Sequence, residues 1–272
     1  MGFKKITPDS KDIEAEATAP NSVGSTAVAT KPESAPTPDG YYPDQYDDTS
    51  RDVEVPVIGL VNGIGPLAKK FRNQAGKFVL GESILGDAVS VIPIAVVKFF
   101  VEKARDGKDI KYGTPEYATR KIFATASEAA KVGYVLDFDN KARNRIEEVA
   151  RVGFLVVAPE GAEPIDFALR APGDLRLALA KCTYQRGGYR KTFRPLFNYA
   201  NSLALSEGVE TKGLTHTQVF AAAKPWRNIW TLTPSEETKN ENTWFEPQIA
   251  RGAALTPEAI AWITENYGKS RA

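Results

Sequence analysis

The sequence predicts a mainly β fold with a few short helices, in the class of Greek-key barrels or sandwiches. Short segments rich in valine, isoleucine and aromatic residues recur along the chain, separated by polar segments with glycine, proline and asparagine. This pattern is typical of strands joined by turns. Segments with a helical spacing of apolar residues are few and short, and many short strands bury their apolar faces by closing or pairing sheets.

Composition divides the chain near residue 52. Residues 1–52 are rich in Ala, Thr, Ser, Pro and Asp and hold few large apolar residues, so folding could not bury enough apolar surface to offset the entropy lost on ordering. Residues 1–50 carry four lysines against nine acids, a charge of −5, and the rest of the +1 chain therefore stands at +6. We expect a disordered acidic arm over residues 1–52 and a single β-rich domain over residues 53–272.

The first elements of this domain are expected to be strands. Residues 53–62 predict an edge strand or the start of a strand, because Pro56 cannot donate a hydrogen bond to a ladder. Residues 77–87 predict a short strand followed by a turn. Residues 88–102 predict a long core strand, with a bend or bulge at Pro93.

A short helix and two further strands follow. Thr125 begins a capping-box pattern, and Gly133 is a plausible stop for the helix. After a polar loop over residues 137–145, residues 149–158 and 165–170 are predicted strands.

The segment from Arg170 to Arg194 combines basic and aromatic residues. Residues 175–184 and 189–194 flank the pair Gly187-Gly188, which predicts a β-hairpin with a tight turn. Alternate leucines from residue 175 to residue 179 commit one face of the hairpin to the core. The rings of Tyr184, Tyr189 and Phe193 are expected to be exposed near the turn.

The last third is expected to hold three helices between strands. Pro195 suits the first turn of a helix over residues 195–205, and a capping box at Thr215 precedes a second helix that Pro225 ends. Residues 229–232 and 243–245 are predicted strands joined by a polar loop. A terminal helix begins at residues 256–257 and continues to about residue 267, and at least two of the tryptophans 226, 230 and 244 are expected in the core.

Motifs of enzymes and membrane proteins are missing from the sequence. It contains no phosphate-binding P-loop and no GxSxG nucleophile elbow. Cys182 lies in an apolar strand and is predicted to be a buried, inert thiol, and His216 lies in a helix cap. We expect no enzyme activity, no cofactor and no metal, although Asp137 and Asp139 could share one side of an extended segment and hold a divalent cation. Because there is no long apolar run and no secretory signal, we expect a cytoplasmic protein.

The basic and aromatic residues together predict a surface for single-stranded nucleic acid, because cations meet phosphates and rings stack on bases. A second basic and aromatic cluster precedes Lys77, and a third surrounds Trp226. The predicted contact residues are Lys69, Lys70, Arg72, Arg176, Lys181, Tyr184, Arg186, Tyr189, Arg190, Lys191, Arg194, Trp226 and Arg227.

Residues 149–247 resemble bacteriophage-type single-stranded DNA-binding proteins of the oligonucleotide/oligosaccharide-binding (OB) fold class. The resemblance lies in the style and order of the segments ARVGFLVVAPEG, IDFALRAP, LRLALAKCTYQRGGYRKTFRPL and WTLTPSEETKNENTWFEP. It implies an OB-like Greek-key barrel with inserted elements, which binds single-stranded DNA without strong sequence preference in phage replication or recombination. Many such proteins carry an acidic tail at the C-terminus, whereas the acidic arm here is N-terminal and could compete with DNA or recruit replication and recombination proteins.

Two other classes of function remain open at this stage. A β-rich body with a disordered arm also suits a structural or assembly protein, such as a virion component. A nuclease or other metal enzyme would use Asp137 and Asp139 together with further acids. In a viral context the protein would act in the host cytoplasm.

Overall fold

Strands dominate the computed structural model, which describes residues 55–111, 114–136, 142–162 and 167–268. The described residues belong to one compact unit of the chain, and the prediction of a mainly β fold with short helices is confirmed. The predicted arm, residues 1–52, lies outside the described residues. None of the helices in the described part is long and apolar enough to cross a membrane.

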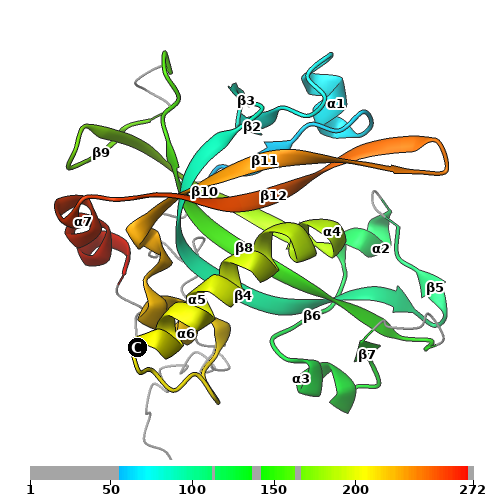
Figure 1. Cartoon of the computed structure of the whole chain (residues 1–272). Helices are drawn as coiled ribbons and strands as arrows, with labels where there is room; N and C mark the ends of the chain where they lie inside the picture. The colour runs from blue at the N-terminus through cyan, green and yellow to red at the C-terminus, as the bar shows by residue number, and fades with distance from the viewer. Residues whose placement is uncertain (1–54, 112–113, 137–141, 163–166, 269–272) are drawn as a thin grey trace, which may run out of the picture. The chain divides into compact units, whose positions relative to one another are not determined.

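A large antiparallel sheet curls through the middle of the molecule (Figure 1). Its strands follow the order β12-β11-β4-β8-β10-β9, and short strands extend it, since β5 and β6 pair with β4 while β7 pairs in parallel with β8. The bounds are β4 (Val89–Arg105), β5 (Lys108–Asp109), β6 (Ile122–Phe123), β7 (Val135–Leu136), β8 (Arg145–Val157), β9 (Leu169–Ala171), β10 (Leu175–Gln185), β11 (Asn228–Lys239) and β12 (Asn242–Ala254).

A separate three-stranded sheet consists of β1 (Ile58–Leu60), β2 (Phe78–Leu80) and β3 (Ser83–Gly86), in that order. The predicted edge strand after Pro56 is confirmed, because β1 is an outer strand of this sheet. Its start lies against β10, where the Lys181 amide donates to the Pro56 carbonyl at 2.9 Å.

The longest strand, β4, lies at the centre of the core. Its register with β8 shifts between Pro93 and Ala95, so the predicted bulge at Pro93 is confirmed. Most of its side chains are buried on both faces. The main core extends from β4 over β8 and β10 to the helices, and fully buried side chains such as Phe154, Leu177 and Leu196 belong to it.

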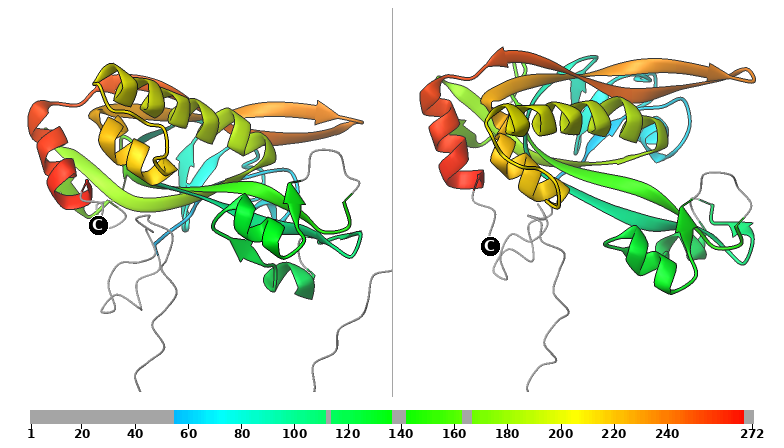
Figure 2. Two further views of the ribbon diagram at one scale, coloured as in Figure 1. Left: turned by 90° about the horizontal axis from the view of Figure 1, so that it is seen from below. Right: turned by 60° about the horizontal axis from the view of Figure 1, so that its bottom comes forward.

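The helices are short, and two of them cover one face of the sheet. In both views of Figure 2, α5 and α6 lie side by side, while β6, α3 and β7 form a separate group near the far end of β4 and β8. The helices are α1 (Pro66–Lys70), α2 (Pro115–Ala118), α3 (Ala126–Lys131), α4 (Arg186–Gly188), the π-helix η1 (Tyr189–Phe193), α5 (Arg194–Ser206), α6 (His216–Ala223), the 3-10 helix η2 (Pro225–Arg227) and α7 (Pro257–Tyr267).

Four predicted helices are confirmed near their predicted starts, including α3, whose N-cap Thr125 accepts from the Glu128 amide. Pro195 lies in the first turn of α5. The capping box at Thr215 is complete, because its hydroxyl accepts from the Gln218 amide and the Gln218 side chain accepts from the Thr215 amide. Thr256 caps α7 by accepting from the Ala259 amide.

The predicted hairpin around Gly187-Gly188 is wrong. The chain leaves β10 at Gln185 and continues as helix from Arg186 to Ser206. Gly187 lies so close to Glu246 of β12 that a Cβ atom there would overlap the carboxylate. Gly187 therefore serves a close approach between a helix and a strand, which a sequence pattern cannot distinguish from a turn.

The predicted loop between β11 and β12 is also wrong, because β11 continues through it to Lys239. The two strands then pair along nearly their whole length up to a tight turn. Asn240 and Glu241 in this turn both have positive φ, 49° and 65°, which matches the right-handed twist of a two-stranded ribbon. The polar residues lie on an exposed ribbon, so their polarity indicates solvent contact and not a loop.

Candidate nucleic-acid interface

Three of the predicted phosphate-contacting arginines come together on one side of the helix that follows β10. Arg186, Arg190 and Arg194 line a pocket of about 200 Å³ at the ends of β4, β7 and β8. The pocket is completed by Lys103, Leu136, Ile146, Glu147, Glu148 and Tyr189. We call this the arginine pocket.

The arginine pocket is basic, although two carboxylates lie in it. The Arg186 Nε lies 3.2 Å from the Glu147 Oε2, and an Arg194 nitrogen lies 3.9 Å from the Glu148 Oε2. The side chains of Arg186 and Arg194 remain 71% and 59% exposed. Arg190 is exposed, and its charge helps to lower the pKa of Glu237 on β11. These cations are therefore accessible to an anionic ligand.

A π-helix carries Arg190 and separates Arg186 from Arg194. In η1 the Arg194 amide donates to the Tyr189 carbonyl, five residues earlier. Such wide turns are rare and are frequent at functional sites. Lys191, on the other side of the helix, points toward the β11–β12 ribbon. There it pairs with Glu237, lies 3.3 Å from the Glu246 carboxylate, and donates to the Ser235 hydroxyl at 3.0 Å. Lys191 is predicted to contact phosphate, but in the structure its ammonium binds the ribbon and so connects the helix to β11 and β12.

The predicted exposure of Tyr184, Tyr189 and Phe193 is wrong, because the three rings are 2%, 6% and 2% exposed. Tyr184 follows the alternation of β10 onto the face that the helices cover. Tyr189 and Phe193, four residues apart, pack with ring centroids 4.8 Å from each other. Removing a large aromatic ring from water lowers the free energy of the folded state, so burial is the favoured position for these side chains. Because they are buried, the three rings are not available to stack on bases.

The cluster around Trp226 is structural as well. Trp226 and Trp230 are buried, which confirms that at least two of the three tryptophans belong to the core. The Trp226 Nε1 donates to the Thr264 hydroxyl at 3.0 Å, and Arg227 pairs with Glu207. Trp226 therefore presents no face to a ligand.

The remaining predicted cations do not join the arginine pocket. Lys69, Lys70 and Arg72 are exposed in and after α1. Successive side chains of a strand point to opposite faces of the sheet. On β12, Phe245 contacts Gly76 near this group, whereas the next residue, Glu246, contacts Gly187 near the arginines. The two groups of cations therefore lie on opposite faces of β12. On β10 itself, an Arg176 nitrogen donates to the Ala162 carbonyl at 3.1 Å, and Lys181 is half-buried beside β1.

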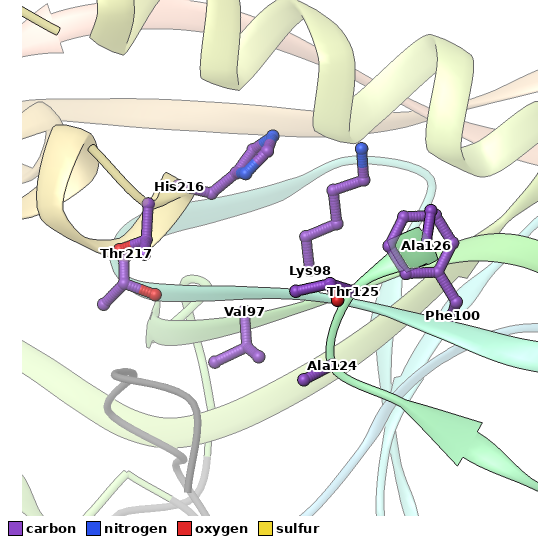
Figure 3. Close-up of a pocket in the computed structure, with 9 residues that line it drawn as sticks. Val97, Lys98, Phe100, Ala124, Thr125, Ala126, His216 and Thr217 are labelled. Atoms are coloured by element: carbon purple, nitrogen blue, oxygen red, sulfur yellow. The ribbon is translucent and has the colours of Figure 1, made fainter. Parts of the chain in front are cut away.

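A second pocket, of about 350 Å³, is lined by Lys98 of β4 and is drawn in Figure 3. Residues 124–126 line one side and His216 and Thr217 the other, with β4 between them. The Lys98 ammonium lies 2.8 Å from the Glu148 carboxylate, which belongs to the arginine pocket. We call this second cavity the edge pocket. The sequence contains one signal for it, the charge of Lys98 within the apolar run from Val91 to Val101.

The single histidine and cysteine are half-buried groups with shifted pKa values. Burial, together with the charge of Lys98, lowers the pKa of His216 to about 4, and its ring lies 4.4 Å from that of Phe197. Burial raises the pKa of the Cys182 thiol to about 11, which is consistent with the predicted inert thiol. No group of three or more potential metal ligands occurs among the described residues, and Asp137 and Asp139 lie outside them.

Comparisons with models of protein families, with curated protein sequences and with solved structures found no match to this chain.

Proposed function

We propose that this protein binds single-stranded DNA without strong sequence preference. The observation that carries the proposal is the convergence of Arg186, Arg190 and Arg194 in one solvent-accessible pocket. Guanidinium groups suit phosphate oxygens because their planar N–H groups form paired hydrogen bonds. A row of arginines along a helix provides successive contacts for a strand of phosphates.

The strand order supports an OB-like barrel as the architecture behind this function. In the sheet, β4, β8 and β10 are consecutive neighbours, and β11 returns to lie beside β4, which is the spatial order of a Greek key. With β12 the sheet has five long strands, which supports the five-stranded barrel with inserted elements that the resemblance implies. OB folds bind oligonucleotides on their second and third strands and on the loop between the first and second. The arginine pocket lies at the ends of β8 and β10, beside that connection.

Binding in this proposal is mainly electrostatic. The buried Tyr184 and Tyr189 remove the stacking platforms that the sequence predicts, so phosphate contacts provide most of the affinity. Each phosphate that a cation neutralises releases counterions, and the affinity therefore falls steeply with salt. A protein of this kind protects single strands during replication or recombination. Recruitment of other proteins by the acidic arm is a hypothesis outside the described residues.

A binding assay with a fluorescein-labelled oligothymidylate of about 16 nucleotides tests the proposal. At salt concentrations from about 50 to 200 mM, the logarithm of the affinity should fall linearly with the logarithm of salt. Arg190→Ala should weaken binding several-fold and reduce the salt slope by about 1. Lys212→Ala removes the same charge from an exposed position beyond the far end of α5 and should leave both unchanged. Absence of binding by the wild type at low salt would refute the proposal.

A further inference from the structure

One length of β4 lacks a neighbouring strand on the side away from β8. On that side β11 pairs with β4 as far as Val91, and β6 begins to pair at Phe100. No described strand pairs with the residues between them on this side. The edge pocket opens at this gap, between α6 and the start of α3 (Figure 3).

The backbone of Lys98 faces the gap. In an antiparallel ladder, alternate residues direct both N–H and C=O toward the same neighbour. The Val96 carbonyl accepts from the Thr217 hydroxyl at 2.8 Å, and the Glu102 amide donates to the Lys121 carbonyl at 2.9 Å, both away from β8. The β4–β8 register does not shift between Val96 and Glu102. By this alternation the N–H and C=O of Lys98 point into the edge pocket.

This open donor and acceptor pair is short. Thr217 covers the carbonyl of Val96 on one side, and Phe100 pairs with Phe123 of β6 on the other. An added peptide strand would need several successive open pairs, whereas one residue is open here. The gap therefore suits a single flat group that carries a hydrogen-bond donor next to an acceptor.

The walls of the edge pocket suit an aromatic heterocycle. Val97, Phe100 and Ala126 contribute apolar surface, and the volume of about 350 Å³ is at the lower end of ligand pockets, which span roughly 300–1,000 Å³. His216 lines the pocket as a neutral ring near pH 7, because burial and Lys98 lower its pKa to about 4. A neutral imidazole can donate one hydrogen bond and accept another.

The edge pocket adjoins the arginine pocket. Lys98 lines the first and Glu148 the second, and their charged groups lie 2.8 Å apart. Arg194 lies 3.9 Å from the same Glu148 carboxylate. A strand whose phosphates contact the arginines would therefore bring its bases to the entrance of the edge pocket.

We propose that the edge pocket takes one unstacked nucleobase of the bound strand, with the backbone N–H and C=O of Lys98 pairing with the edge of that base. This inference rests on the proposed function, since the same strand must contact the arginines. Because every nucleobase presents adjacent donors and acceptors, backbone pairing of this kind favours the presence of a base without selecting one sequence.

The test compares two labelled oligomers of equal length, an oligothymidylate and an abasic oligomer that carries the phosphates without bases. The wild type should bind oligothymidylate about ten-fold more tightly, as expected for one well-held base. Ala126→Phe, which fills the pocket, should abolish this preference and leave the affinity for the abasic oligomer unchanged. Ala130→Phe places the same ring on an exposed position of α3 and should retain the preference. Circular dichroism spectra of both variants serve as the control for folding and should match the spectrum of the wild type.

The single histidine provides a second measurement on the wild-type protein. The Hε1 resonance of His216 in a proton NMR spectrum should shift on addition of oligothymidylate and stay in place with the abasic oligomer. Equal affinity of Ala126→Phe and wild type for oligothymidylate, or an unmoved His216 resonance, would overturn the base pocket while phosphate binding stands. Failure of the wild type to bind either oligomer at low salt would overturn the proposed function, and the inference with it.

Discussion

The ammonium of Lys98 lies 2.8 Å from the carboxylate of Glu148, across the neighbouring strands β4 and β8. Both side chains are largely shielded from water, at 19% and 27% exposure. Their charges act in opposite directions on His216, since Lys98 lowers its pKa and Glu148 raises it. The ion pair therefore places one charge in each pocket, and the pKa of His216 is sensitive to both charges.

We expect His216 to titrate with a pKa of about 4, well below the ordinary value of 6.5. Burial is the largest cause, because it disfavours the charged imidazolium. The unfolded chain takes up this proton at a higher pH than the folded chain, so this contribution to stability is present above pH 6.5 and is lost as the pH falls toward 4. The Hε1 chemical shift against pH measures the value directly.

Two substitutions separate the contributions of the ion pair to this pKa. Lys98→Met removes the nearby cation and should raise the pKa of His216, whereas Glu148→Gln removes the anion and should lower it. A pKa near 6.5 in the wild type would show that the imidazole is exposed to water, against the burial described above.

A second prediction concerns the buried carboxylate of Glu102. It accepts hydrogen bonds from Arg105 at 2.8 and 2.6 Å, from the Lys121 amide at 3.1 Å, and from the Tyr134 hydroxyl. Burial alone would raise its pKa, but these donors lower it to about 2. Compared with an unfolded value of 4.5, this corresponds to about 3 kcal/mol of stability at neutral pH. The contribution is present above pH 4.5 and is lost as the pH falls toward 2.

Glu102→Gln should therefore lower the free energy of unfolding in urea at pH 7, and the gap to the wild type should close as the pH falls below 4.5. Tyr134→Phe removes one of the hydrogen bonds and should cost about 1–2 kcal/mol. A gap that stays constant between pH 6 and 3 would contradict the depressed pKa of Glu102.

Local signals predicted much of the sheet and the helix starts. Pro93 predicted the bulge in β4, and the capping box at Thr215 predicted the start of α6, because proline and capping residues act on the backbone within a few positions. Apolar and β-branched residues predicted the strands β4, β8 and β10, because such residues are enriched in buried strands.

The candidate site was less predictable, because long-range contacts determine it. Gly187 packs against Glu246, which is 59 positions further along the chain, and no local pattern distinguishes that contact from a hairpin turn. The exposure of Tyr184 depends on which face of β10 the helices cover. Arg186, Arg190 and Arg194 are predicted contact residues, but their common position on one side of a helix depends on the helical conformation after β10, which the hairpin prediction excludes.

A third prediction follows from the buried hydroxyl of Tyr184. Within the described part of the chain this hydroxyl forms no well-aligned hydrogen bond and interacts only weakly with the Cys182 thiol, and burial raises its pKa well above the ordinary value. Because a buried hydroxyl without a well-aligned partner is a desolvation cost, Tyr184→Phe should leave the free energy of unfolding unchanged or raise it by about 1 kcal/mol. Urea denaturation measures the change, and a loss above 1 kcal/mol would show that the hydroxyl is bonded. The affinity for oligothymidylate should not change.

The last prediction uses two adjacent glycines with opposite expected effects. A Cβ at Gly187 would overlap the Glu246 carboxylate, which also lies near Lys191 and accepts from the Trp244 indole N–H at 3.2 Å. Gly187→Ala should therefore destabilise the protein by about 1–3 kcal/mol. At Gly188 the nearest atom to an added Cβ is a Tyr184 ring carbon at 3.4 Å, an ordinary contact. Gly188→Ala should stabilise the helix by about 0.5–1 kcal/mol.

A double-mutant cycle with Glu246→Ala identifies the cause of the loss at Gly187. In the absence of the carboxylate, Gly187→Ala should cost much less, whereas the effect of Gly188→Ala should stay the same. Both are measured as free energies of unfolding in urea at constant m-value. If Gly187→Ala were as well tolerated as Gly188→Ala in the wild-type background, the helix would not approach the Glu246 carboxylate of β12 as closely as described.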